Sequence, residues 1–179
     1  FTALAVLTLQ ALGCKLFFLA ADQFGLVAGL FFTPCQFGLF GIGLLGLGYP
    51  EAYGGTAEGI DIYHLNIVAE ELARTSLGGI NSTLLVHGIG LPPVVHFASD
   101  AMKETVIPPI LRGEKRISLA ITEPSGGSDV ANIQSTARRD GDHYIVNGSK
   151  TFISGGMGAN WFTTAVRTGG EGSRGISVL

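Results

Sequence analysis

An abrupt change of sequence pattern near Arg116 constrains the fold more than any other feature. Before it, residues 61–75 repeat apolar side chains at helical spacing on one stripe (Ile62, Leu65, Ala69, Leu72 and Ala73). After it, β-formers alternate with Asp140-Gly141 and Asn147-Gly148, pairs that favour the positive φ of reverse turns. A helical segment followed by a β segment predicts an α+β chain of two domains. We expect a helical N-terminal domain at residues 1–115 and a β domain at 116–179.

The helical part carries its own start and stop signals. Asp61 is a candidate N-cap, and Glu70 and Arg74 are spaced to pair on the wet face of the same helix. Residues 78–97 predict a buried helix with a break before Val94. A short helix over 100–107 follows, begun by Ser99 and ended by Pro108-Pro109.

The β part predicts an antiparallel unit that is still open at its end. Its expected strands share a high content of β-branched and aromatic residues. They are residues 117–121, 143–146, 151–154 and 161–167.

Composition excludes several classes of function. The net charge of −3 leaves no basic excess for nucleic acid. The four histidines and two cysteines show no metal-ligand spacing, and two free thiols favour a reducing compartment. Residues 23–50 are uncharged, but glycines and Pro34 interrupt them and no positive flank precedes them, so we predict no membrane span. Gly41–Gly46 spells GxGxxG, but Pro50 follows too soon for the helix that a nucleotide fingerprint needs.

The stretch Ile121–Asp129 carries the chemistry. Its sequence is ITEPSGGSD, in which Pro124 ends a strand and Gly126-Gly127 allows close approach of the backbone. Hydroxyls of Thr122, Ser125 and Ser128 make this loop rich in hydrogen-bond donors. The loop suits a flat polar heterocycle or a phosphate. The residues alone support a tight turn without a ligand equally well.

Several blocks in order resemble the acyl-CoA dehydrogenase family. Residues 119–129 (LAITEPSGGSD) resemble its signature, and residues 142–156 (DHYIVNGSKTFISGG) resemble its next block. Residues 50–55, 70–74 and 107–114 also match in kind, so the resemblance covers about residues 38–179. Residues 1–37 depart from it, because apolar and small residues stand where the family has charged, amphipathic helices.

The resemblance implies a fold and a reaction. The fold is a helical N-terminal domain and an antiparallel, barrel-like β middle domain, here incomplete, followed by a helical bundle. The reaction is FAD-dependent α,β-dehydrogenation of a fatty acyl-CoA to the trans-2-enoyl-CoA, as in fatty acid β-oxidation. The expected partners are acyl-CoA, an electron-transfer flavoprotein and further copies in a homotetramer. The expected location is the cytoplasm, or alternatively the mitochondrial matrix.

The resemblance also implies site residues. Leu119, Ile121 and Thr122 match positions that line the flavin ring, and Gly127 and Ser128 match positions near the cofactor pyrophosphate and acyl-CoA, with Ser128 assigned to substrate. Phe152, Ile153 and Ser154 complete the cofactor set. Phe152 stacks near the flavin and the Ser154 hydroxyl reaches flavin N5, although ordinary β-core packing is the plain reading of Phe152.

The family's catalytic base is a glutamate in the C-terminal bundle, so no catalytic residue is assigned here. Glu123 and Asp129 are expected to be structural. The same motifs also fit an acyl-CoA oxidase or a flavin monooxygenase of the same superfamily. A flavin-free binding scaffold is the alternative from another class, and a membrane protein is a third, motivated only by residues 1–50.

Overall fold

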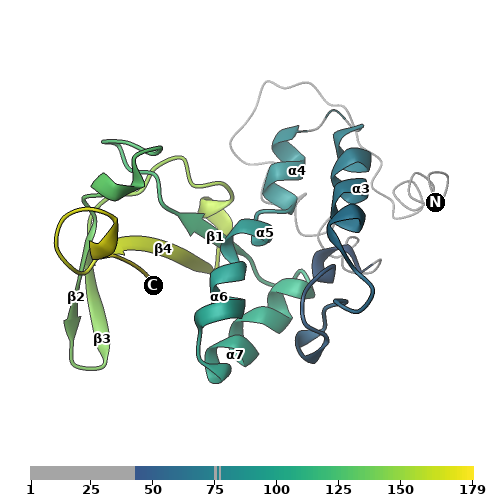
Figure 1. Ribbon diagram of the computed structural model, residues 1–179, viewed down its shortest axis with the longest axis horizontal. Helices are drawn as coiled ribbons and strands as arrows, with labels where there is room; N and C mark the ends of the chain where they lie inside the picture. The colour runs from purple at the N-terminus through teal and green to yellow at the C-terminus, as the bar shows by residue number, and fades with distance from the viewer. Residues whose placement is uncertain (1–42, 75, 77) are drawn as a thin grey trace.

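The structure is a computed structural model that describes residues 43–179 except residues 75 and 77. Its helices lie on one side and its sheet on the other, with β1 running between them beside α5 (Figure 1). The predictions for residues 1–42, which include most of the uncharged run, the first glycine of GxGxxG and both cysteines, lie outside the described residues. Within the described part, no helix is long and apolar enough to cross a membrane.

The helical side consists of short helices joined by tight connections. They are α3 (Ile62–Ala73), α4 (Gly78–Leu84), α5 (His87–Gly90), α6 (Pro92–Phe97) and α7 (Asp100–Leu111). Two 3₁₀ turns precede them, η1 (Leu44–Gly46) and η2 (Glu51–Tyr53).

Helix α3 begins after its predicted N-cap, Asp61, and ends at Ala73, two residues before the end of the predicted segment. The Asp61 side chain accepts hydrogen bonds from the backbone N–H groups of Tyr63 (3.0 Å) and His64 (3.3 Å). The Arg74 guanidinium lies 3.1 Å from the Glu70 carboxylate, which confirms that pair. The apolar stripe, however, is not buried among the described residues, since Ile62 is 61% exposed.

Two helix predictions need correction. Residues 78–97 form three short helices, and the last break falls before Pro92, which starts α6 at the position where proline is tolerated. Helix α7 does not end at Pro108 but continues to Leu111. Burial of Ile107 and Leu111 stabilises this last turn and offsets the two hydrogen bonds that the prolines cannot donate.

The sheet is mixed rather than antiparallel. Its strands are β1 (Ile117–Ala120), β2 (Thr136–Asp140), β3 (His143–Asn147), β4 (Trp161–Arg167) and β5 (Ile176–Val178). The order is β1-β4-β2-β3, with β5 on β4. The pairs β2–β3 and β4–β5 are antiparallel, which is the expected direction, although β2 was not among the predicted strands. Strand β1 pairs with β4 in parallel, and the strands do not close into a barrel.

One predicted strand is absent. Residues 151–154 form a loop, because Phe152 has the left-handed backbone angle φ 55°, which a β-ladder does not accommodate. The Asp140-Gly141 turn does form, with Gly141 at φ 63°, and it joins β2 to β3 in a hairpin that projects away from the helices (Figure 1).

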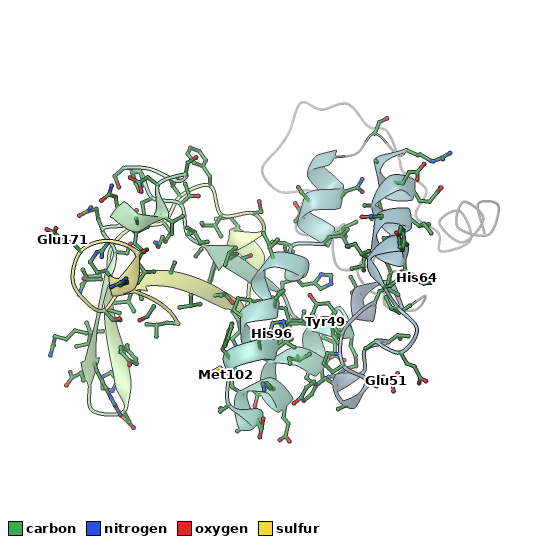
Figure 2. All side chains as sticks on the ribbon, viewed as in Figure 1. Tyr49, Glu51, His64, His96, Met102 and Glu171 are labelled. Atoms are coloured by element: carbon green, nitrogen blue, oxygen red, sulfur yellow. The ribbon has the colours of Figure 1, made fainter. Side chains whose placement is uncertain are left out.

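The main core joins the two sides. It contains Leu91, Val106, Ile107, Ile110, Leu111 and Ile117. Trp161 of β4 and Tyr49 pack against this cluster, and Figure 2 shows Tyr49 close to the helices of the core. Strands β1 and β4 are therefore held directly on the helices, which fixes the end of the sheet where the candidate site lies.

Candidate functional site

Two loops that are distant in sequence meet at the end of β1. We name residues 121–128 the Thr122 loop and residues 148–156 the Ser154 loop. The backbone N–H of Thr151 donates to the Thr122 carbonyl (2.9 Å), and the Ser118 hydroxyl donates to the Ser154 carbonyl (2.8 Å). The Lys150 ammonium donates to the Ile121 carbonyl (2.9 Å). The Ser154 loop is therefore tied to the end of β1 at three points.

An open hollow of about 870 Å³ lies against the Ser154 loop. Its walls combine exposed apolar side chains with hydroxyls and one cation. The lining residues are Ala120, Lys150, Thr151, Phe152, Ile153, Ser154, Gly156, Met157, Phe162 and Thr164. No carboxylate lines this hollow in the part of the chain that the structure describes.

Strand register decides which side chains reach the hollow. In the parallel pair of β1 and β4, Ala120 stands beside Thr164, and both line the hollow. Because side chains alternate along a strand, Leu119 and its neighbour Thr163 lie on the opposite face. The Thr163 hydroxyl there donates to the Gly90 carbonyl of α5 (2.6 Å), which confirms that this face is turned to the helices.

The Ser154 loop presents its apolar side chains outward. Phe152 is 91% exposed, and its positive φ is unusual for a residue with a side chain. Gly155, at φ 71°, lets the loop pass close to β1 and to the connection between α4 and α5, since a Cβ there would lie 3.3 Å from the Ser118 hydroxyl and 3.5 Å from Val86. Exposed apolar groups on a firmly anchored loop indicate a surface that a ligand or another part of the protein covers.

The Thr122 loop is a tight turn with free hydroxyls. Glu123 and Gly126 exchange backbone hydrogen bonds of 2.9 and 3.1 Å. A Cβ on Gly127 would lie 3.1 Å from the Thr122 side chain, so glycine keeps that side of Thr122 open. Within the described residues, the hydroxyls of Thr122, Ser128 and Ser154 form no hydrogen bond with another protein group, which leaves them available to a ligand.

A buried ion pair connects the two loops. Glu123 accepts hydrogen bonds from the Lys150 ammonium (2.9 Å) and from the backbone N–H groups of Ser135 (2.9 Å) and Gln134 (2.6 Å). Burial alone would raise the pKa of Glu123, but the bonds from Lys150, Ser135 and Gln134 outweigh burial and lower that pKa to about 2. Glu123 is therefore a fixed anion inside the protein, as expected for a structural residue. Asp129 is exposed and accepts a bond from Asn132.

The structure brings together some of the predicted site residues. Phe152, Ile153 and Ser154 line the hollow, whereas Leu119, Ile121, Thr122, Gly127 and Ser128 do not. Thr122 and Ile121 reach the Ser154 loop through their carbonyls, and Ser128 is exposed on the turn. Contact of these residues with a flavin stays a prediction.

Sequence reasoning missed other residues of the hollow. Phe162 and Thr164 enter it only because β4 pairs with β1, and the 40 residues between the two strands (121–160) carry no local signal for that pairing. Lys150 lies inside the second motif block, and its nearness to Glu123 of the first block is the signal that could have linked the two loops.

Two family descriptions match the chain in tandem. "Acyl-CoA dehydrogenase, N-terminal domain" matches residues 37–114, and "Acyl-CoA dehydrogenase, middle domain" matches residues 118–179. The chain belongs to the acyl-CoA dehydrogenase family. The helices followed by an incomplete mixed sheet are thus the N-terminal domain and part of the middle domain of the acyl-CoA dehydrogenase fold.

Individual acyl-CoA dehydrogenases are similar over most of the chain. An acyl-CoA dehydrogenase of Emericella nidulans is 42% identical over 74% of the chain and 31% of its own length. The mitochondrial isobutyryl-CoA dehydrogenase of Bos taurus is 38% identical over 68% of the chain and 29% of its own length. The solved acyl-CoA dehydrogenase of Bacillus anthracis, in complex with FAD, is 34% identical, with a TM-score of 0.68, over 76% of the chain and 23% of that structure's chain. The chain thus spans about a third of the length of these curated acyl-CoA dehydrogenases.

The residues present fit the flavin that the acyl-CoA dehydrogenase family uses. The exposed rings of Phe152 and Phe162 line the hollow, and the free hydroxyl of Ser154 lies in the same loop as Phe152. The open backbone beside Gly127 and the free hydroxyl of Thr122 supply polar groups at the neighbouring turn. A ring that is apolar across its faces and polar along one edge matches this combination of groups.

Proposed function

We propose that the protein dehydrogenates an acyl-CoA thioester between its α and β carbons with FAD as cofactor. The observation that carries the proposal is the junction of the Thr122 loop with the Ser154 loop beside a hollow that has aromatic walls. In the finer form of the proposal, the substrate is a fatty acyl-CoA and the product is the trans-2-enoyl-CoA. The reaction is then a step of fatty acid β-oxidation.

Each cofactor residue has a proposed task. The Thr122 hydroxyl and the backbone around Leu119 and Ile121 bind the pyrimidine edge of the ring. The Ser154 hydroxyl donates to flavin N5, and Phe152 and Ile153 cover the ring and exclude water. Gly127 and Ser128 lie along the pyrophosphate.

The chemistry divides between cofactor and protein. FAD, when bound, supplies the acceptor for the hydride that leaves the β carbon of the substrate. The protein's donors stabilise the negative charge that the ring gains, and the walls of the hollow orient the substrate against it. Ser128 is proposed to bind the substrate as well. No described carboxylate is proposed as the base that removes the α proton, because Glu123 is held as a buried anion by Lys150 and two backbone N–H groups.

Further proposals concern the setting of the enzyme. We infer reoxidation of the enzyme by an electron-transfer flavoprotein and assembly into a homotetramer, both from the family resemblance. The division into domains at residues 115 and 116 is proposed on the same basis. A cytoplasmic location is proposed, with the mitochondrial matrix as the alternative that the name of the Bos taurus relative suggests.

The test is anaerobic reduction of the intact, flavin-loaded protein. We expect the visible absorbance of the flavin to bleach when a suitable acyl-CoA is added, and a panel of straight and branched acyl-CoA substrates identifies the preferred chain. Slow return of colour in air supports a dehydrogenase over an oxidase. A protein that is isolated without flavin and takes up none contradicts the proposal.

A further inference from the structure

We propose that the buried pair of Glu123 and Lys150 is a positioning device that sets the spacing between the Thr122 loop and the Ser154 loop. This inference rests on the proposed function, because the spacing matters only if a flavin lies against both loops. It assigns to Glu123 and Lys150 a role in the geometry of the site and not in proton transfer.

Lys150 bonds to the residues on both sides of Thr122. Its ammonium is 2.9 Å from the Glu123 carboxylate and 2.9 Å from the Ile121 carbonyl. The two acceptors flank Thr122, whose carbonyl accepts the N–H of Thr151 (2.9 Å). Three hydrogen bonds therefore fasten residues 150–151 to the residues on both sides of the Thr122 hydroxyl.

Glu123 bonds to the backbone at the start of β2. Its two carboxylate oxygens take up the N–H groups of Gln134 and Ser135, where the chain enters β2. Glu123 thus holds the Thr122 loop against the sheet while Lys150 holds the Ser154 loop against Glu123. The Glu123 side chain is buried and the Lys150 side chain is only 12% exposed, so each depends on the other for its charge balance.

The location of the pair distinguishes it from an ordinary structural ion pair. Lys150 lines the hollow, two residues before Phe152 and four before Ser154. Ser118 fixes the other end of the same loop at the Ser154 carbonyl. Removing the pair leaves the loop attached through the Ser154 carbonyl and through the Thr151 N–H, but it removes both bonds of Lys150 to the residues that flank Thr122. The end of the loop that carries Phe152 then has one attachment in place of three, and a displacement of about 1 Å in such a site reduces the rate of reaction by up to about 100-fold.

The experiment uses the intact protein and compares three changes. Lys150→Met removes the charge and keeps the length of the side chain, Glu123→Gln keeps the shape of the acceptor, and Lys150→Arg keeps the charge with a different reach. The readouts are the dissociation constant for FAD, the visible absorption spectrum of the bound flavin and the temperature of unfolding. Glu114→Gln is the matched control, because Glu114 forms an exposed pair with Arg112 (2.8 Å) and neither residue lines the hollow.

We expect Lys150→Met and Glu123→Gln to raise the dissociation constant for FAD about tenfold or more. Loss of outer residues that hold metal ligands in position lowers affinity for the metal by a similar factor. We expect the flavin spectrum to shift in both, and in Lys150→Arg by a smaller amount in the same direction. Glu114→Gln leaves affinity and spectrum unchanged. These shifts support a positioning role because a purely structural pair changes the unfolding temperature alone.

Two results overturn the inference, and they differ from failure of the proposed function. If Lys150→Met folds and binds FAD with unchanged affinity and spectrum, the pair does not position the site. If Lys150→Met does not fold, Lys150→Arg decides, and an unchanged affinity together with an unchanged spectrum in that variant overturns the inference. If the unsubstituted protein binds no FAD, the proposed function itself is wrong and the inference is overturned with it.

Discussion

At the scale of single residues, Phe152 combines a strained backbone with an exposed ring. Its φ of 55° is costly for any residue with a Cβ, and its ring gains little from burial within the described residues because it is 91% exposed. We predict that Phe152→Gly leaves the free energy of unfolding unchanged or raises it by up to about 1 kcal/mol, because relief of strain offsets the added freedom of the unfolded chain. The same change should weaken FAD binding in a fluorescence titration of the intact protein.

Phe97 provides the control for this prediction. It is 86% exposed, but it belongs to α6 and has no left-handed backbone to relieve. Phe97→Gly should therefore lower the free energy of unfolding by up to about 1 kcal/mol, the cost of glycine in a helix interior, because Phe97 is the last residue of α6, and it should leave FAD binding intact. Equal losses of stability in the two variants would contradict the argument from strain.

Tyr49 gives the protein a predictable weakness at alkaline pH. Burial raises the pKa of Tyr49 from 10.0 to about 12, so its ionisation is easier in the unfolded chain. Ionisation of Tyr49 should therefore leave the free energy of unfolding unchanged below about pH 10 and lower it by about 2–3 kcal/mol as the pH rises from 10 towards about 12 and beyond.

Tyr49→Phe tests this weakness. The variant loses the hydrogen bond from the Tyr49 hydroxyl to the His87 carbonyl (3.3 Å), so it should be less stable by about 1 kcal/mol at pH 7. It should lose less stability than the unsubstituted protein above pH 10, as measured by urea unfolding across pH. Tyr63→Phe, at an exposed position of α3, should change neither value, and a parallel alkaline loss in Tyr49→Phe would refute the assignment.

At the scale of elements, the sequence predicted best what local chemistry decides. Helix α3 begins after its Asp61 cap, β4 spans the predicted Trp161–Arg167, and the Asp140-Gly141 turn forms. The missed elements depend on distant contacts. Burial of Ile107 and Leu111 carries α7 past its prolines, and three attachments to the end of β1 hold β-forming residues 151–154 as a loop.

The pairing of β1 with β4 explains a second limit. The predicted site included Leu119, but parallel register with β4 turns Ala120, not Leu119, towards the hollow. Alternation along a strand can be read from sequence, but which face meets the hollow depends on how the strand is attached to the helices. The motifs therefore identified the two loops of the candidate site, whereas the register of β1 with β4 determines which strand residues line the hollow beside them.

Thr163 is the polar attachment between β4 and α5. Its hydroxyl donates to the Gly90 carbonyl at 2.6 Å in a buried position. Thr163→Val keeps the shape but leaves that carbonyl without its donor, so we predict a loss of about 1–3 kcal/mol in the free energy of unfolding. Thr168→Val is the control because Thr168 is exposed, and it should cost less than about 0.5 kcal/mol. Equal values from urea unfolding would show that the attachment is not stabilising.

At the scale of the whole molecule, one hydrophobic core contains residues from both sides of the change in sequence pattern that separates helices from strands. Ile117 of β1 belongs to the same buried cluster as Ile107 of α7, and Trp161 of β4 packs against it. The candidate site is built on the strands, yet its rigidity depends on this shared core. Helices and sheet should therefore lose their structure together.

This unity can be tested with the single tryptophan of the chain, Trp161. We predict that unfolding followed by Trp161 fluorescence coincides with unfolding followed by helical circular dichroism, because both depend on one core. Ile107→Ala, which empties space in a fully buried position of α7, should lower stability by about 2–5 kcal/mol and shift both transitions equally. Met102→Ala, at an exposed position of the same helix, is the control. A Trp161 transition that stays in place while the helical transition moves would mean that the sheet folds without the helices, and the candidate site would then need no support from them.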